Sequence, residues 1–334
     1  MKSIALVILN YNGIELLKKF IDIVISNSPQ ADVVMVDNCS TDESVDWFKS
    51  SYPELQCIEL DQNYGYAGGY NEGLKQVKHP YYALLNSDLC VTENWLIPLL
   101  ELFSKEKEIA ILQPHILDYK KKDHFEYAGA AGGYIDQYGI PFCRGRILNT
   151  LEKDVGQYDR TTDVFWASGA CFLIRNEVFW KLGGFDTDFF AHQEEIDLCW
   201  RAYNTGYRVC SVGESKVYHI GGGTLAPSSK KVYLNHRNSL YMLTKNIPDN
   251  IRNKILFKKL LLDGLIGINY MLTLNFSNTW AILKAHFAFY KNYPKMLAKS
   301  HGASKRRNYF YRKSILMDYF VRKVRFFGQL EQKI

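Results

Sequence analysis

The sequence predicts an α/β protein built around a parallel sheet. Over residues 1–90, short apolar runs rich in branched side chains alternate with segments whose apolar residues recur at helical spacing. This alternation is typical of parallel strands joined by right-handed helical crossovers. The composition, with 47% hydrophobic and 23% charged residues, is that of a globular protein. A chain of 334 residues is long enough for one large domain or two smaller ones.

The expected strands are short apolar runs, as in sheets that are buried on both faces. They cover residues 4–9, 33–36, 56–60 and 81–85. Helices are expected at residues 14–25, 44–50, 69–77 and 95–103. The first helix begins after Asn12-Gly13 and ends near Pro29, because such residues commonly bound helices.

Beyond residue 105 the pattern is less regular. Residues 129–145 are rich in glycine and tyrosine and are expected to form loops or hairpins. A strand-like segment at 216–218 precedes His219, and from residue 233 onward the pattern is helical. We therefore expect a boundary near residue 250, which divides the chain into a principal domain, 1–250, and a helical, basic region, 251–334.

Polar residues follow each predicted strand at its carboxyl end. In sheets of this kind, ligands bind beyond those ends, where several strands deliver side chains to one edge. The residues concerned carry amides or carboxylates: Asn10, Asn12, Asp37, Asn38, Asp61, Asn63, Asn86 and Asp88. The sequence therefore predicts a polar ligand site at this edge of the sheet.

Two residues are candidate ligands of a divalent cation. Asp88 ends the fourth strand, where one carboxylate can hold a cation while substrate phosphates fill its other positions; ordinary turn chemistry is the alternative. His219 precedes three glycines, which would let a phosphate approach the backbone. It is a candidate second ligand or, alternatively, a structural histidine.

The segment 183–201 concentrates acidic residues among aromatic ones, with Glu194, Glu195 and Asp197 within four positions. Desolvation raises the pKa of a carboxyl group and makes it a stronger base. The alternative is the first turn of an ordinary helix, where acids interact favourably with the helix dipole. Adjacent helical residues point about 100° apart, so Glu194 and Glu195 do not suit the two opposed carboxylates of a glycoside hydrolase.

A glycine-rich segment, residues 63–73, opens the third expected helix. Its composition is similar to that of a nucleotide-binding turn. It lacks the Gly-x-Gly-x-x-Gly spacing of dinucleotide-binding proteins, which disfavours a nucleotide-dependent oxidoreductase.

Five motifs occur in a characteristic order. They read VILNYN at 7–12, VDNCSTD at 36–42, NYGYAGGYNEG at 63–73, LNSD at 85–88, and GGFD followed by EEIDLCWR within 183–201. In this combination the chain resembles the family 2 glycosyltransferases, most closely their bacterial rhamnosyltransferase-like branch. The resemblance covers about residues 1–245. It implies a GT-A fold, with a Rossmann-like, nucleotide-sugar-binding sheet flanked by helices in a catalytic domain at 1–250, and it does not extend to the helical, basic region.

The resemblance assigns several residues to a nucleotide-sugar donor. These are Asn10, Asn12, Asp37, Asn63, Gly65, Asn71 and Asn86. Within this set Asp37 would hydrogen-bond the pyrimidine. Asn86 stands where the family usually has an acid, and it would therefore touch the ribose rather than a metal.

The resemblance also implies a metal site and a base. Asp88 and His219 would hold a Mg²⁺ or Mn²⁺ ion. Glu195 would be the catalytic base, and Glu194 is the alternative, since glutamate is one methylene longer than the aspartate usual in the family.

The implied activity is inverting sugar transfer. Such a reaction needs one base to deprotonate the acceptor hydroxyl and a cation to offset the charge on the departing diphosphate. dTDP-L-rhamnose is the first donor candidate and a UDP-hexose or UDP-N-acetylhexosamine the second. The acceptor would be a lipid-linked or growing cell-surface polysaccharide. The remaining alternative is a non-catalytic binding protein with the same fold.

The net charge of +6 conceals an asymmetry. Residues 251–334 carry 17 Lys/Arg and 3 Asp/Glu, whereas residues 1–250 carry 24 and 32. Basic residues at 305–325 interleave with aromatic and aliphatic ones, as in a helix at an anionic membrane surface. A basic helix packed on the domain is the alternative. Polar residues within 260–283 disfavour a spanning helix, and we recognise no nucleic-acid-binding module.

The cysteines and the N-terminal sequence bear on localisation. The seven cysteines include no Cys-x-x-Cys pair, which indicates reduced thiols in a cytosolic protein. No signal peptide is recognisable. We therefore expect a cytoplasmic protein that is peripheral at the inner face of the cell membrane.

Overall fold

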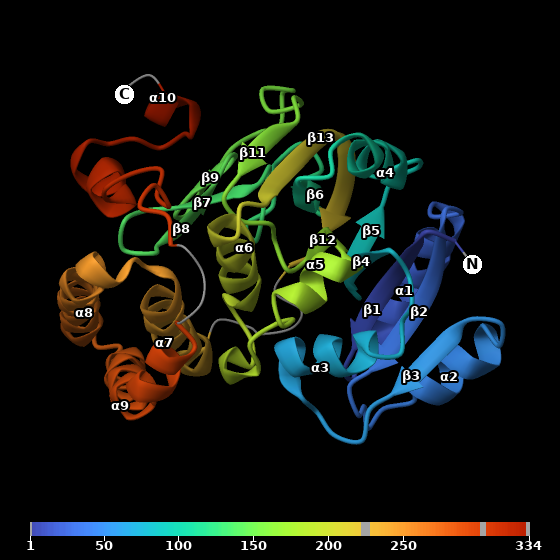
Figure 1. The fold of residues 1–334 in the computed structure, drawn as a ribbon, viewed down its shortest axis with the longest axis horizontal. Coiled ribbons are helices and arrows are strands. Elements are labelled where there is room, and N and C mark those ends of the chain that lie inside the picture. Colours follow the sequence, from blue (N-terminus) through green and yellow to red (C-terminus); the bar gives the residue numbers. More distant parts are fainter. Residues whose placement is uncertain (1, 222–227, 301–304, 332–334) are drawn as a thin grey trace.

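The computed structural model describes residues 2–221, 228–300 and 305–331. Its centre is a nine-stranded sheet in the order β11-β13-β6-β12-β4-β1-β2-β3, with β5 paired to β13 beside this path (Figure 1). The architecture is α/β, with helices on both faces of the sheet. This agrees with the predicted fold class.

The N-terminal part of the sheet is parallel. Its strands are β1 (Ile4–Asn10), β2 (Ala31–Asp37), β3 (Gln56–Glu59) and β4 (Tyr81–Asn86). The connecting helices are α1 (Ile14–Ser26), α2 (Ser44–Ser51) and α3 (Gly65–Leu74). These elements confirm the predicted ones, except that α3 begins four residues earlier than expected. It can do so despite its glycines because the Phe190 carbonyl accepts hydrogen bonds from the Tyr66 and Ala67 amides.

The other half of the sheet, for which the sequence predicted no strand direction, is mixed. Its elements are β5 (Leu89–Val91), α4 (Leu96–Lys105), β6 (Ile109–Asp118), β11 (Thr162–Val164), β12 (Cys171–Arg175), α5 (Asn176–Lys181), α6 (Glu194–Asn204) and β13 (Arg208–His219). Strand β12 lies between β4 and β6 and is antiparallel to both. No helical crossover of the kind expected in the first ninety residues leads into β12.

The chain between β6 and β12 forms a second, four-stranded sheet. Its strands are β7 (Gly133–Ile135), β8 (Pro141–Cys143), β9 (Arg146–Ile147) and β10 (Thr150–Leu151), and all its pairings are antiparallel. The hairpins expected within residues 129–145 are therefore confirmed.

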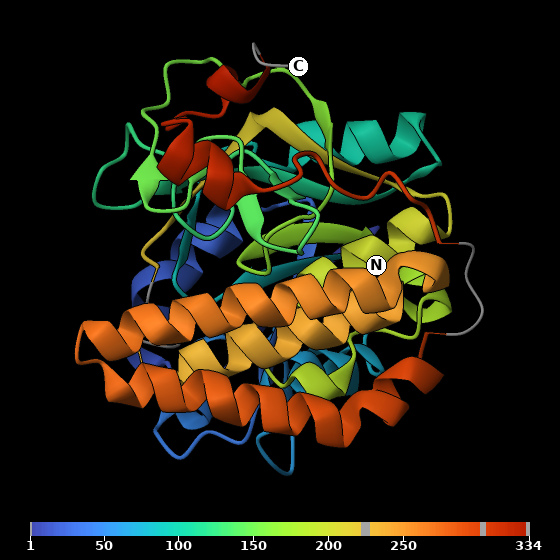
Figure 2. The ribbon, with the colours of Figure 1, turned by 90° about the vertical axis from the view of Figure 1, so that its left-hand side faces the viewer.

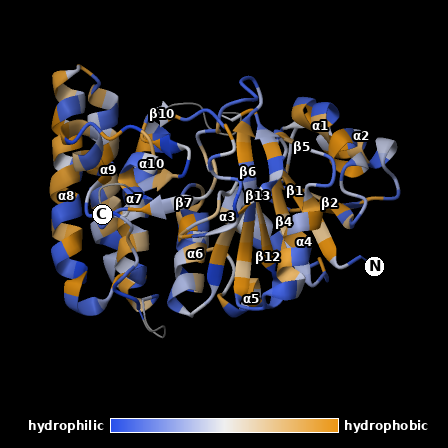
Figure 3. Ribbon diagram, turned by 90° about the horizontal axis from the view of Figure 1, so that it is seen from above, coloured by the Kyte–Doolittle hydropathy of each residue, from blue (hydrophilic) through white to orange (hydrophobic). Residues whose placement is uncertain are grey.

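The core lies on both faces of the large sheet, because successive strand residues point to opposite sides. Along β1, Ile4 and Leu6 pack with α1 and α4, whereas Ala5 and Val7 pack with α3 and α6. The strands at the centre of the molecule are accordingly apolar, while the helices carry both kinds of residue (Figure 3).

Three long helices follow β13 and lie side by side (Figure 2). They are α7 (Ser229–Asn246), α8 (Asp249–Leu272) and α9 (Phe276–Ala298). Helix α7 packs on α6, and α8 and α9 pack on α7. Within the described residues, none of the helices combines the length and the hydropathy needed to cross a membrane.

The basic segment at 305–325 does not form the interfacial helix expected of it. Residues 305–331 contain only a π-helical turn, Met317–Val321, and the short α10 (Gly328–Glu331). Tyr309, Ile315 and Phe327 are buried against the principal domain, and the Tyr311 amide donates to the Ile135 carbonyl of β7. Part of the apolar surface of this segment is thus used in folding, whereas Phe320 and Val321 are exposed. This agrees with a segment packed on the rest of the protein but not with a helix.

Candidate active site

The carboxyl ends of β1 and β2 bring two predicted residues together. The Asn10 side-chain amide donates to Asp37 Oδ1 over 2.9 Å, and Ser40 donates to Asp37 through both its hydroxyl and its backbone amide. Two carboxylate oxygens offer about four acceptor positions, so one position on Asp37 stays open. The buried Oδ1 atom of Asn10 has no partner within the described residues. The pair can therefore still accept hydrogen bonds from a ligand.

Asn12 shapes the loop that follows β2. Its Oδ1 atom accepts a hydrogen bond from the Thr41 amide over 2.7 Å. Its own backbone has a φ of 50°, a conformation that asparagine tolerates better than most residues. Asn12 is exposed beside Asn10 and Asp37, as the predicted pocket requires.

The glycine-rich loop is held by Asn38, a strand-end residue to which the family resemblance assigned no individual role. Asn38 donates through its amide to Asn63 Oδ1 and to the Gly65 carbonyl, each over 3.0 Å. Gly65 has a φ of +70°, and a Cβ atom there would lie 2.7 Å from Phe190. Asn63 and Gly65 therefore fix the loop at the predicted edge.

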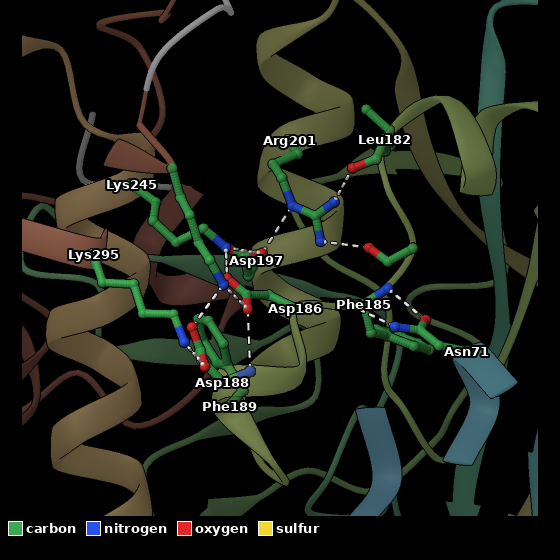
Figure 4. A network of polar contacts seen from close by, with 12 residues as sticks. Asn71, Leu182, Phe185, Asp186, Asp188, Phe189, Asp197, Arg201, Lys245 and Lys295 are labelled. Atoms are coloured by element: carbon green, nitrogen blue, oxygen red, sulfur yellow. Dashed lines mark hydrogen bonds and ion pairs between the residues drawn. The ribbon is translucent and has the colours of Figure 1, made fainter. Parts of the chain in front are cut away.

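Asn71 is placed differently from the other predicted donor-binding residues. Its side-chain amide donates to the Phe185 carbonyl over 2.8 Å and accepts from the Phe185 amide over 2.9 Å. Both of its polar groups are thereby engaged on the turn after Gly184 (Figure 4). The sequence placed Asn71 in the donor site because it shares the glycine-rich segment, but this geometry indicates a structural role.

A cavity of about 180 Å³ gathers most of the remaining candidates. Its lining includes Tyr66, Asn86, Asp88, Glu194, Glu195 and His219. These residues come from α3, the β4–β5 turn, α6 and the end of β13. A larger hollow of about 910 Å³ lies near the amino end of β4 and contains none of the predicted site residues.

Asp88 and His219 meet in this cavity, as predicted. His219 Nε2 lies 3.0 Å from Asp88 Oδ1, and His219 Nδ1 lies 3.4 Å from Glu126 Oε2. Burial opposes the protonation of His219, but the two carboxylates outweigh it and raise its pKa to about 10. Glu126, on the loop after β6, was missed because no local pattern marks it. The three glycines after His219 include residues 222 and 223, which lie outside the described residues.

The donor set fits a divalent cation in one respect. The second carboxylate oxygen of Asp88 is buried and has no hydrogen-bond partner among the residues that the structure describes, so it can accept a metal bond. Within the described residues, however, the structure forms no cluster of three or more His, Cys, Asp or Glu side chains spaced to hold a metal. A cation bound by Asp88 and His219 would need further ligands from substrate or water.

Glu194 and Glu195 begin α6; Glu194 is buried and Glu195 is half-buried. Burial raises the pKa of Glu195 to about 7. Burial and the neighbouring charge of Glu195 raise the pKa of Glu194 well above its usual range. Each carboxyl group keeps one buried oxygen without a partner. These properties agree with the desolvated, basic carboxylate that the sequence predicted.

Asp197 behaves differently from this pair. Burial acts to raise its pKa, but Lys245 and Arg201 outweigh burial and lower it. Asp197 accepts hydrogen bonds from both cations over 2.8 Å (Figure 4). It therefore joins α6 to α7 and is not available as a base.

The cavity also contains groups that sequence reasoning missed. The Tyr66 hydroxyl donates to the Gly169 carbonyl over 2.6 Å and lies beside the two glutamates. His192, whose φ is 71°, lines the same wall, and burial lowers its pKa to about 4. Tyr66 belongs to the glycine-rich motif at 63–73, so the sequence could have indicated it. His192 belongs to none of the five motifs, and only the fold brings it to the cavity.

Comparison with known proteins gives a family match. Residues 5–183 match the family model described as glycosyl transferase family 2. A low-salt glycan biosynthesis hexosyltransferase of Haloferax volcanii is 26% identical over 243 residues, which span 71% of this chain and 74% of the relative. An N-acetylglucosaminyl-diphospho-decaprenol L-rhamnosyltransferase of Mycobacterium tuberculosis is 24% identical over 63% of this chain and 73% of its own length.

Solved glycosyltransferases share the fold. S. aureus TarS 1-349 in complex with UDP-GlcNAc aligns with a TM-score of 0.58 and 14% identity over 90% of this chain and 84% of that chain. GalNAc-T7 with UDP, GalNAc and Mn²⁺ aligns with the same TM-score and 19% identity, and this chain spans about half of it (48%). Since the family model covers more than half of the sequence and the neighbours have the GT-A fold, the chain belongs to glycosyltransferase family 2 and has a GT-A fold.

Proposed function

We propose that the protein transfers a sugar, with inversion, from a nucleoside diphosphate sugar to a lipid-linked or growing cell-surface glycan. The observation that carries this proposal is the cavity in which Glu195, with a pKa of about 7, lies with Asp88 and His219 at the carboxyl edge of a family 2 sheet. A non-catalytic binding protein would have no need of a desolvated carboxyl group at this place.

Glu195 is the proposed base. A pKa near 7 means that a large fraction of its carboxyl groups is ionised at neutral pH and can take the proton of an acceptor hydroxyl. Burial and the neighbouring charge of Glu195 raise the pKa of Glu194 well above its usual range, which favours its protonated form. Inversion requires only one such base, because the departing diphosphate needs no protein acid.

The donor would lie along the strand ends. Asp37 has one acceptor position for a pyrimidine N–H, and Asn10, Asn12, Asn63 and Gly65 border the same edge. Asn86 lies between this edge and the cavity and would contact the ribose. Asp88 and His219 would hold Mg²⁺ or Mn²⁺, and such an ion offsets the negative charge of a departing diphosphate.

The relatives support two donors. The L-rhamnosyltransferase relative favours dTDP-L-rhamnose as the donor. The acceptor named for that relative is a diphospho-decaprenol lipid, which favours a lipid-linked acceptor here. The hexosyltransferase relative, and the TarS structure with UDP-GlcNAc, favour a UDP-hexose or UDP-N-acetylhexosamine as the alternative. A cytoplasmic location at the inner face of the membrane would suit either acceptor.

A donor screen tests the proposal. Purified protein would be incubated with each nucleotide sugar and with Mn²⁺ or Mg²⁺, and release of nucleoside diphosphate would be followed. Asp88→Ala should abolish release and remove the metal dependence of donor binding in calorimetry. Asp22→Ala is the matched control, because Asp22 is an exposed carboxylate of α1, outside the predicted site, that accepts a hydrogen bond from Tyr52. Unchanged metal dependence in Asp88→Ala would show that the metal site is elsewhere.

A further inference from the structure

Helix α8 exposes an apolar stripe on the side away from its packed face. The stripe consists of Phe257, Leu261, Leu265, Ile268 and Leu272, each at least half exposed. Their spacing of three or four residues places them on one face of the helix. The packed side of α8, which includes Ile255, faces α7 and α9. Helix α8 is therefore apolar on two sides, and only one of them is covered within the described residues.

Helix α9 repeats the arrangement. Its exposed apolar residues recur at positions 276, 280, 283, 287 and 290, again three or four apart. The two stripes converge at the turn that joins the helices, where Leu272 and Leu274 are each 75% exposed and Phe276 is 60% exposed. We call residues 265–283 the hairpin tip. Figure 2 shows α8 and α9 as the outer helices of this side of the molecule.

The backbone at the tip gives an independent indication. Leu274 has a φ of 59°, a left-handed conformation that glycine or asparagine adopts most readily. A large apolar residue therefore occupies a turn position where backbone geometry favours a small or polar one. Folding gives no reason for this choice, because the Leu274 side chain is mostly exposed.

The charges of the hairpin are of one sign. Between positions 250 and 300 the sequence has eight Lys/Arg but only one acidic residue, the buried Asp263. Four of the lysines are exposed and have no carboxylate within 4.0 Å in the described part of the chain: Lys254, Lys258, Lys284 and Lys291. None of the residues from 264 to 283 is charged. The hairpin thus has an uncharged tip with exposed apolar side chains, and its lysines lie on the parts of α8 and α9 beyond the tip.

Lys284 stands at a suitable height on α9. Lys284 is eight residues beyond Phe276, about 12 Å along the helix at 1.5 Å per residue. Interfacial helices bury their apolar faces about 5–10 Å below the boundary of headgroups and acyl chains. An apolar tip at that depth would bring Lys284 to the level of anionic headgroups, and Trp280 to the region that tryptophan prefers.

The tip lies at the end of the α7–α9 helices at which α7 begins, and the first turn of α7 borders the cavity. Helix α7 runs away from the cavity, starting at Ser229, and α8 returns antiparallel to it. Lys231, in the first turn of α7, lines the cavity. Because α8 has 24 residues and α7 has 18, α8 is about 9 Å longer at 1.5 Å per residue. A surface that contacts the tip would therefore lie on the side of the cavity.

We propose that the tip of the α8–α9 hairpin inserts into the interface of an anionic lipid membrane and presents membrane-bound acceptors to the cavity. The lysines complement anionic headgroups, whereas a twofold contact between two copies would bring like charges together. We assign insertion to the hairpin tip rather than to the tail at 305–331, because Tyr309, Ile315 and Phe327 of the tail are buried in the fold, although Phe320 and Val321 are exposed. The acceptor role rests on the proposed function, but membrane binding by the tip does not.

Vesicle flotation of the full-length protein tests this inference. Vesicles of phosphatidylcholine with added phosphatidylglycerol are compared with pure phosphatidylcholine at low and high salt. The triple variant Leu272→Ser/Leu274→Ser/Phe276→Ser should lower partition onto the mixed vesicles at least about tenfold, since three large apolar side chains are lost. Changing the four exposed lysines to glutamine should weaken binding to the mixed vesicles about tenfold or more, and should have little effect on pure phosphatidylcholine.

Two control variants isolate the tip. Val155→Ser removes an apolar side chain that is 74% exposed elsewhere on the surface. Phe320→Ser/Val321→Ser removes exposed apolar side chains of the tail. Both should float as the wild type does. Leu274→Gly suits the left-handed backbone, so it should keep the fold and still reduce flotation about threefold or more.

Several outcomes would overturn the inference. These are a wild type that does not float, a triple variant that floats normally, and a loss of flotation in the tail variant. A dimer that the triple variant converts to a monomer, without vesicle binding, would identify the tip as a contact between copies. Glu195→Gln should float normally, so loss of transfer and loss of membrane binding can be told apart.

Discussion

The ammonium group of Lys245 lies 2.8 Å from Oδ2 of Asp197, and both side chains are buried. The ammonium group of Lys245 also lies 2.7 Å from Asp186, so this one α7 side chain forms ion pairs with two carboxylates (Figure 4). Replacing Lys245 with Met would leave both charges buried without this partner. We expect a loss of about 3–5 kcal/mol in the free energy of unfolding, measured by urea denaturation.

Lys295→Met is the control for this variant. Lys295 pairs with Asp188, but its side chain is more than half exposed. Exposed ion pairs contribute about 0–1 kcal/mol, so the loss should be small. Equal losses in the two variants would show that the buried network does not hold α7 to α6.

Glu195→Gln should lower turnover about 10²-fold or more with little change in donor affinity, because it removes the base but keeps the shape of the side chain. Glu194→Gln should have a milder effect, since burial and the charge of Glu195 raise the pKa of Glu194 and favour its protonated form. Steady-state kinetics and donor titration of both variants measure this. The reverse order would assign the base to Glu194, and two unaffected variants would make the acidic pair structural.

The raised pKa of Glu195 predicts two opposite pH dependences. Turnover should rise with pH up to about 7, because the base acts in its ionised form. Stability should fall over the same range. The folded protein keeps the proton up to pH 7, whereas an unfolded glutamate loses it near its ordinary pKa of 4.5.

Between pH 4.5 and 7, therefore, Glu195 should lower the free energy of unfolding by up to about 1.4 kcal/mol for each pH unit. Unfolding curves of the wild type and Glu195→Gln across this range test the sign. The wild type should lose more stability than the variant as pH rises. Parallel curves would show that folding does not shift the pKa of Glu195.

Tyr309 should be important for folding although it lies in the basic tail. Its ring stacks on Trp200 with centroids 4.8 Å apart, and its hydroxyl donates to the Gln137 carbonyl. Tyr309→Ala should cost about 3–5 kcal/mol in thermal or urea unfolding, as buried aromatic residues usually do. Phe320→Ala, at an exposed position of the same tail, should change stability by less than about 0.5 kcal/mol. If the tail did not pack on the rest of the protein, both Tyr309→Ala and Phe320→Ala would change the free energy of unfolding only slightly.

The sequence by itself determined the α/β class, the first four strands and the residues at their ends. It did so because strand and helix periods are local properties, and because parallel strands bring their carboxyl ends to one edge. The same local reasoning identified Glu194 and Glu195, since acids beside aromatic residues are expected to be desolvated.

The tertiary structure decided what depends on distant partners. It alone showed that Lys245 neutralises Asp197, that Glu126 faces His219, and that Asn71 is engaged on Phe185. It also buried Tyr309 and Phe327 of the tail and left Phe257, Phe276 and Phe287 of the α8–α9 hairpin exposed. The two segments have similar compositions, with aromatic, aliphatic and basic residues. Whether the tail or the hairpin packs on the rest of the protein depends on the surface that the fold places beside each segment. No local sequence pattern contains that information.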